Sequence, residues 1–187
     1  MNNIDIIKNA TPLIDLRSPV EFEKGSLISS VNIPILDNDE RAQVGIEFKL
    51  SGEEKATDLG YRLLKHKKNS IVDKWKQFIL NNPTSYIYCM RGGLRSKIAQ
   101  SWLKEIGINI PTIQSGYKSL RNTSINILDS VRNDKKKWII LAGRTGTGKT
   151  TILKNLECSI DLEKIAQHRG SAFGSLETPQ PTMINFE

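Results

Sequence analysis

Twice in this chain a short apolar segment runs into a glycine-rich loop and then into a helical pattern. The first segment covers residues 86–88 and precedes CMRGGLRS at residues 89–96. The second covers residues 138–142 and precedes GRTGTGKT at residues 143–150. Buried strands that alternate with helices are typical of α/β proteins with a parallel sheet. The sequence therefore predicts an α/β fold with a glycine-rich loop after each of two strands.

Other apolar patterns complete a first domain around the first loop. Strands are predicted at residues 12–16, which places Asp15 at a strand end, and at 110–113; helices are predicted to start near residue 20 and to cover 51–64, 71–79 and 98–106. We expect a parallel sheet with helices on both faces over residues 1–125 and a polar, basic linker at 126–137. Residues 138–187 are then the beginning of a P-loop α/β domain. Only 38 residues (187 minus 149) follow Lys149, whereas a complete domain usually needs about 100 or more.

Few residues are available for disulfide, metal or histidine chemistry. Cys89 and Cys158 are the two cysteines, and His66 and His168 the two histidines. Two cysteines make no disulfide framework, and no zinc-ligand spacing is present. The start of the chain lacks the pattern of a signal peptide, and no apolar run is long enough to span a membrane. We therefore expect a cytoplasmic protein with reduced thiols, no metal site built from these residues and no membrane partner.

A net charge of +7 indicates an anionic partner. Basic residues concentrate in two tracts: Arg62, Lys65, Lys67, Lys68, Lys74 and Lys76 in the first, and Arg121, Arg132, Lys135, Lys136, Lys137, Arg144 and Lys149 in the second. Such tracts bind phosphate backbones by counterion release. Taken singly, each tract is equally consistent with a solvated helix face or a charged linker.

The first loop is predicted to activate Cys89 as a nucleophile. Gly92 and Gly93 let the backbone turn tightly, so that several N–H groups and the N-terminus of the next helix point at the sulfur. Arg91 and Arg95 add positive charge, which favours the thiolate and a bound anion. Ser96 can hydrogen-bond within the loop or cap the helix. The alternative is an inert buried cysteine beside a glycine turn.

The second loop fits the pattern G-x4-G-K-T of a phosphate-binding P-loop. Its candidate phosphate-binding residues are Gly143, Thr145, Gly146, Thr147, Gly148, Lys149 and Thr150. Backbone amides would surround a phosphate, Lys149 would reach its terminal oxygens, and the Thr150 hydroxyl could bind Mg²⁺. Asp161 and Glu163 are the best candidates for the acidic partner of such a magnesium ion. Phosphate binding is thus better supported than hydrolysis, and no tightly bound cofactor is expected.

Residues 4–121 resemble the rhodanese family. The resemblance rests on residues 15–22 (DLRSPVEF), GSLISSVNIP at residues 25–34, the Cys89 loop, and Gly116 with Tyr117 after the last strand. Ser26 departs from the pattern, because rhodaneses usually have histidine there. The resemblance implies a rhodanese fold with Cys89 as the nucleophile of a sulfur or selenium transfer.

The loop from Cys89 to Arg95 is one residue longer than that of common rhodaneses. Its C-x5-R spacing resembles cysteine phosphatases, especially the rhodanese-related dual-specificity type, so a bound phosphate or selenophosphate fits. Phosphatase activity is therefore an alternative. Against it, Tyr88 stands where those enzymes commonly have histidine, and no general-acid aspartate can be identified.

Over nearly its whole length the chain resembles the first half of the tRNA 2-selenouridine synthase family. The resemblance is carried by the Cys89 loop, SGYKSLR at 115–121, the P-loop, DLEKIAQHRGSAFG at 161–174, and QPTMINFE at the end. We interpret the chain as a truncated member or an N-terminal fragment.

This resemblance implies the replacement of sulfur by selenium in wobble 2-thiouridine of tRNA, with selenophosphate as donor and an S-geranylated intermediate made from geranyl diphosphate. It implies that Cys89 attacks the donor or carries selenium in a persulfide-like form, that the P-loop holds a diphosphate, and that basic tracts contact tRNA. Gln167, His168 and Arg169 are either phosphate or RNA contacts or a solvated turn. A rhodanese-type sulfurtransferase and a non-catalytic phosphate- or RNA-binding remnant remain alternatives.

Overall fold

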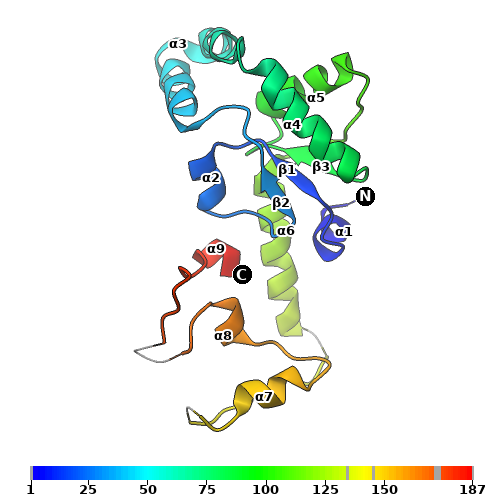
Figure 1. The fold of residues 1–187 in the computed structure, drawn as a ribbon, viewed down its shortest axis with the longest axis vertical. Helices are drawn as coiled ribbons and strands as arrows, with labels where there is room; N and C mark the ends of the chain where they lie inside the picture. The colour runs from blue at the N-terminus through cyan, green and yellow to red at the C-terminus, as the bar shows by residue number, and fades with distance from the viewer. Residues whose placement is uncertain (1, 134, 145, 171–173, 187) are drawn as a thin grey trace. The chain divides into compact units, whose positions relative to one another are not determined.

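The computed structural model describes residues 2–133, 135–144, 146–170 and 174–186. The chain divides into two compact units, Met1–Ile127 and Leu128–Glu187 (Figure 1). The first contains α1 (Asn3–Lys8), β1 (Leu13–Asp15), α2 (Pro19–Glu23), β2 (Ser30–Asn32), α3 (Asn38–Leu64), α4 (Lys68–Asn81), β3 (Tyr86–Tyr88), α5 (Leu94–Glu105) and most of α6 (Gly116–Ser130). The second contains the end of α6, a 3-10 turn (Val131–Asn133), α7 (Lys149–Lys154), α8 (Leu162–Ile165) and α9 (Met183–Phe186). None of the described helices is both long and apolar enough to cross a membrane.

Three parallel strands form the sheet of the first unit, in the order β2-β1-β3. Leu13 pairs with Ser30 on one side and with Tyr86 on the other. The central strand β1 is buried at all three positions, as expected for a strand covered on both faces. The predicted α/β fold with a parallel sheet is confirmed, and so are the predicted strands that became β1 and β3.

The strand predicted at residues 110–113 is reduced to a single parallel bridge between Ile87 and Thr112. Ile87 donates its N–H to the carbonyl of Pro111 (3.1 Å) and accepts from Ile113 (3.0 Å). Pro111 has no N–H of its own, and the chain turns at Ser115, whose φ is +60°. Proline and this early turn prevent a longer ladder.

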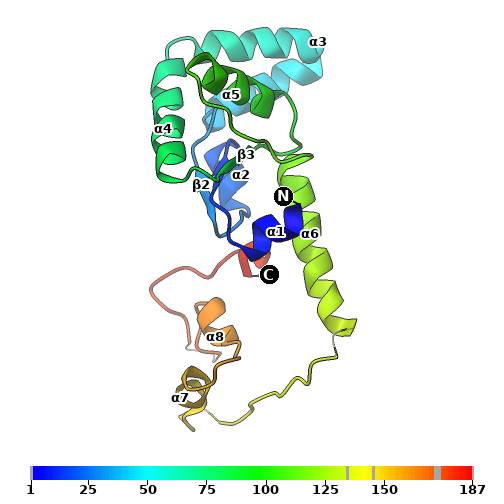
Figure 2. The ribbon, with the colours of Figure 1, turned by 90° about the vertical axis from the view of Figure 1, so that its right-hand side faces the viewer.

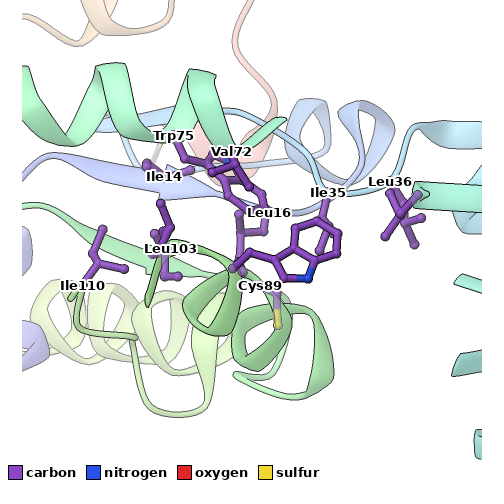
Figure 3. Close-up of a cluster of buried hydrophobic side chains, with 13 residues drawn as sticks. Ile14, Leu16, Ile35, Leu36, Val72, Trp75, Cys89, Leu103 and Ile110 are labelled. Carbon is purple, nitrogen blue, oxygen red and sulfur yellow. The ribbon is translucent and has the colours of Figure 1, made fainter. Parts of the chain in front are cut away.

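Helices cover both faces of this sheet, and alternate strand residues face them. Ile14 and Ile87 belong to a core cluster with Trp75 of α4 and Leu103 of α5, and the rings of Trp75 and Trp102 stack at 6.1 Å. Figure 3 shows labelled members of this cluster, Cys89 among them. The neighbouring strand residues, Leu13 and Tyr88, are buried outside that cluster. On this second face α1 meets α6, where Asn3 donates to Ser119 (3.1 Å) (Figure 2).

Helix α3 is two helices joined at Gly52. Its backbone there has φ +85° and ψ −175°, a conformation that glycine adopts without steric cost. The predicted helix at 51–64 therefore begins beside the kink, whereas the helical segment before it was not predicted. The predicted helix at 71–79 is found as α4, with Val72 and Trp75 buried.

In the second unit the strand predicted at residues 138–142 is wrong. These residues have no regular secondary structure, and Ile139 and Ile140 are 82% and 90% exposed. A parallel strand needs a neighbour for its backbone groups, and the described residues of this unit supply only one isolated bridge, between His168 and Ser175. The linker predicted at 126–137 also starts later than expected, because α6 continues to Ser130.

Candidate functional site

Cys89 follows β3 directly and lies at the base of the loop that leads into α5. Its side chain is only 3% exposed. Gly92 has φ +64° and Gly93 is the N-cap of α5, so the backbone reverses within a few residues and enters the helix. We call residues 89–96 the cysteine loop. The sheet thus fixes the sulfur at one end of the loop, and α5 fixes Arg95 and Ser96 at the other.

The start of α6 holds the cysteine loop through its backbone carbonyls. The N–H groups of Tyr117 and Lys118 donate to the carbonyls of Cys89 (2.8 Å) and Met90 (3.1 Å). Gly116 packs so closely that an added Cβ would lie 2.1 Å from the Cys89 carbonyl oxygen. With these carbonyls engaged by α6, the N–H groups of Arg91 and Gly93 point at the sulfur instead.

The pKa of the Cys89 thiol is lowered, although burial acts against it. Burial alone raises the pKa, because it penalises the thiolate. The Ser96 hydroxyl, the positive charge of Arg95 and the N–H groups of Arg91 and Gly93 stabilise the thiolate and outweigh that effect. A thiolate is the reactive form of cysteine. The site therefore holds a buried sulfur prepared for nucleophilic attack.

Arg95 is held in place by Glu21 of α2. Its Nη1 and Nη2 donate to the Glu21 carboxylate at 2.7 and 3.4 Å, and Arg41 approaches the same carboxylate at 3.7 Å. Burial raises the pKa of Glu21, but Arg95 more than compensates and the pKa is lowered. The carboxylate is thus ionised and fixes the position of the Arg95 guanidinium. The sequence analysis did not assign Glu21 to the site, because 74 residues separate it from Arg95.

Ser96 is buried (1% exposed) directly beside the sulfur. Among the described residues, no partner lies at both the distance and the angle of a hydrogen bond to its hydroxyl. A buried hydroxyl without a partner is uncommon and costs free energy. The Ser96 hydroxyl is therefore placed to stabilise the thiolate of Cys89. Arg91, by contrast, is exposed at the rim of the loop.

Replacing Ser96 by alanine should raise the pKa of Cys89 and slow its alkylation at neutral pH by several-fold. The variant removes a group that stabilises the thiolate and leaves burial, which disfavours it. The rate of reaction with iodoacetamide, measured between pH 5 and 10, reports this pKa. Ser101→Ala, at an exposed position of the same helix, is the matched control and should follow the unchanged protein. Coincident profiles for all three proteins would contradict the role given to Ser96.

A pocket of about 950 Å³ opens beside Cys89. Its wall from α3 is largely apolar and comes from both sides of the kink: Val44, Phe48, Ala56, Tyr61 and Leu64. Basic side chains also line it: Arg41, Arg91, Arg95, Lys118 and Arg121. This pocket was not predicted, because no local pattern reveals that both parts of α3 face the cysteine loop. The pocket matches a ligand with an anionic group and an apolar part.

In the phosphate loop, residues 143–150, Lys149 turns back onto the loop. Its Nζ donates to the carbonyls of Gly143 (2.7 Å) and Arg144 (3.0 Å), and the Thr147 hydroxyl donates to the Arg144 carbonyl (2.8 Å). Gly146 and Gly148 both have φ of +81°, and Thr150 lies exposed in α7. Thr145 lies outside the described residues. The loop therefore surrounds the lysine ammonium group, the group that the sequence assigns to a phosphate.

Of the two predicted acidic partners of a magnesium ion at Thr150, Asp161 is engaged within its own segment. The carboxylate of Asp161 accepts the N–H of Lys164 (3.0 Å) and so caps α8. In the described ranges, no group of three or more His, Cys, Asp and Glu side chains is placed to hold a metal ion.

The other residues that were predicted to contact phosphate or RNA lie at the surface, in different local structures. Lys67 binds Asp37 (2.9 Å) and Glu40 (2.6 Å), which raise its pKa, so part of the first basic tract is neutralised within the fold. His168 lies in a turn, where its Nδ1 accepts the N–H of Gly170 (3.1 Å). Gln167 there has φ +50°.

A parallel sheet followed by a glycine-rich loop that holds a buried cysteine and stabilises its thiolate defines a rhodanese-like domain. In this chain the start of a P-loop segment follows that domain. The chain belongs to the rhodanese-like domain family, whose model matches residues 2–123. Residues 136–187 match the model of the tRNA 2-selenouridine synthase AAA domain.

Curated relatives named tRNA 2-selenouridine synthase are similar over nearly the whole chain. The protein from Marinobacter nauticus is 44% identical over 185 residues, which are 98% of this chain and 50% of that protein. The protein from Shewanella denitrificans is 48% identical over 95% of this chain and 48% of its own length. These matches confirm the resemblance to the tRNA 2-selenouridine synthase family. The chain spans about half the length of these relatives.

A solved structure is similar to part of this chain. It is the N-terminal domain of a "putative ATP/GTP binding protein" from Clostridium difficile 630, with a TM-score of 0.59 and 29% identity. The match covers 62% of this chain and 90% of that domain.

Proposed function

We propose that this chain carries the cysteine site for selenium transfer in the synthesis of tRNA 2-selenouridine. Selenium from selenophosphate would replace sulfur in wobble 2-thiouridine, and Cys89 would be the nucleophile. The observation that carries the proposal is the lowered pKa of a cysteine whose loop offers N–H groups and Arg95 to an anion. The names of the relatives give the substrate class.

The pocket beside Cys89 supports an S-geranylated tRNA intermediate. Replacement at a thiocarbonyl carbon needs a good sulfur leaving group, and an alkylated sulfur leaves as a thiolate. The apolar α3 wall, which includes Val44 and Phe48, could bury a geranyl chain at about 0.8 kcal/mol per CH₂. Basic residues lining the pocket, such as Lys118, would face the RNA phosphates.

The phosphate loop is proposed to hold the diphosphate of geranyl diphosphate. Lys149 would exchange its contacts with the carbonyls of Gly143 and Arg144 for phosphate oxygens. No step through magnesium is assigned.

Selenium incorporation tests the proposal. The purified chain is incubated with selenophosphate and geranylated 2-thiouridine tRNA, and 2-selenouridine is measured by mass spectrometry of the nucleosides. We expect incorporation that depends on Cys89. Incorporation no higher than that of Cys89→Ala would overturn the proposal for this chain.

The length of the cysteine loop favours a second candidate, phosphatase activity. It predicts turnover of an aryl phosphate that Cys89→Ala lacks, without any need for selenium or tRNA. Burial of the sulfur at the base of the loop and Arg95 at its end support this candidate too.

A further inference from the structure

We propose that Cys89 attacks phosphorus and not selenium, so that the cysteine loop cleaves a P–Se bond through an S-phosphocysteine. The proposal rests on the proposed function, since it names the atom of the selenium donor with which the sulfur reacts. It assigns the loop a phosphoryl-transfer step within a selenium-transfer reaction.

Electron balance favours attack on phosphorus. In selenophosphate the selenium is at the selenide level and is bound to phosphorus(V). If the Cys89 sulfur took selenium to form an S–Se bond, the electron pair of the P–Se bond would stay on phosphorus and phosphite would leave. If the sulfur bonds to phosphorus, the pair leaves with selenium as selenide, which takes a proton from water. Water then breaks the S–P bond, which returns the thiolate and releases phosphate, so the sequence needs no oxidant or reductant.

The geometry of the loop supports the same choice. The sulfur is 3% exposed at the base of the loop, and the N–H groups of Arg91 and Gly93 point at it. A tetrahedral phosphoryl group seated in the loop would give its oxygens to these N–H groups and to Arg95 and bring its central atom nearest to the sulfur. A seleno group bound at its end would point outward, toward the pocket.

Ser96 supplies an independent observation. No described residue forms a hydrogen bond of normal distance and angle with its buried hydroxyl. The hydroxyl nevertheless stabilises the thiolate form of Cys89. In a phosphocysteine cycle the sulfur must leave as a thiolate when water attacks phosphorus. A hydroxyl at this place stabilises that leaving group as well as the resting thiolate.

The acidic residues around the pocket fit P–Se cleavage better than cleavage of ordinary phosphate esters. The carboxylates that line it belong to Glu21, which is bound to Arg95, and to Glu53 on α3. An alkoxide leaving group needs a proton donor, whereas selenide is stable enough to leave without one. Cleavage of a P–Se bond therefore needs no proton donor from the site, whereas cleavage of an alkyl phosphate would need one.

The P–Se bond has two sources, free selenophosphate or a selenophosphoryl group already joined to the tRNA base. Both present the same phosphoryl group to Cys89. Adding or omitting geranylated 2-thiouridine tRNA distinguishes them, because an adduct that forms only with tRNA comes from the joined group.

The test is an acid quench of the purified chain after incubation with selenophosphate, with and without that tRNA. We expect a phosphoryl adduct on the Cys89 peptide by mass spectrometry and phosphate as the ³¹P product, both absent from Cys89→Ala. Ser96→Ala should release phosphate several-fold more slowly than the unchanged chain, and Ser101→Ala should not. A selenium adduct on Cys89 with phosphite as product, or phosphate release no faster than that of Cys89→Ala under both conditions, would overturn the proposal. If the phosphoryl adduct forms but the tRNA gains no 2-selenouridine, this proposal holds and the proposed function is rejected. If 2-selenouridine forms without a phosphoryl adduct, the proposed function holds and this proposal is rejected.

Discussion

Replacing Gly116 by alanine is expected to abolish rapid alkylation of Cys89 at neutral pH. The new Cβ would lie 2.1 Å from the Cys89 carbonyl oxygen and 2.7 Å from the Gly92 nitrogen. Both are backbone atoms of the cysteine loop, so the clash can be relieved only by moving the loop or α6. The residue must also adopt φ +56°, which costs an L-residue about 1–2 kcal/mol. The rate of iodoacetamide alkylation and the free energy of unfolding measure the two consequences.

Gly60→Ala is the matched control for Gly116→Ala. Its Cβ in α3 would meet only the Val44 side chain, at 3.9 Å, and alanine favours helix. This variant should keep the alkylation rate of Cys89. Equal alkylation rates and equal stability for Gly116→Ala and the unchanged chain would show that α6 does not shape the loop.

Replacing Arg17 by methionine is expected to remove about 3–5 kcal/mol from the free energy of unfolding. Arg17 is 1% exposed; its Nη2 lies 2.6 Å from the Asp15 carboxylate and donates to the Gly25 carbonyl, and its guanidinium lies 3.7 Å from the centre of the Tyr117 ring. Methionine would leave the charge of Asp15 buried without its partner. Since small domains are stable by about 5–15 kcal/mol, this loss should shift the urea midpoint strongly.

An exposed ion pair provides the comparison for Arg17. Lys68 binds Glu105, and their side chains are 34% and 54% exposed. Lys68→Met should cost only about 0–1 kcal/mol. Combining Arg17→Met with Asp15→Leu should recover part of the loss, because no unpaired charge remains. A loss for Arg17→Met no larger than that for Lys68→Met would contradict the structural role of the buried pair.

Local patterns predicted the elements that present the cysteine loop. The strand at 86–88, the glycine turn and the helix after it are encoded by neighbouring residues, so the sequence places Cys89, Arg95 and Ser96 on the correct elements. The lowered pKa of Cys89 also agrees in direction with the charges and N–H groups that the loop motif implies.

Contacts between distant segments were not predictable. Glu21 reaches Arg95 because β1 and β3 are adjacent strands, which no local pattern reveals. The first part of α3 was missed because apolar residues such as Ile46 and Leu50 are exposed there. The segment at 138–142 was predicted as a strand from its apolar residues and its position before the phosphate loop, whereas a strand also requires a hydrogen-bonding neighbour.

Because α3 is kinked at Gly52 and forms the apolar wall of the pocket, that wall and the reactive sulfur are positioned by different elements. The apolar wall of the pocket comes from the two parts of α3 that meet at this kink, whereas the cysteine loop is fixed by β3, α5 and α6. Substitutions of apolar α3 residues such as Phe48 can therefore reshape the space offered to a substrate without disturbing the charge on Cys89. Among proteins built on this plan, substrate choice should vary through α3 while the chemistry at sulfur stays constant.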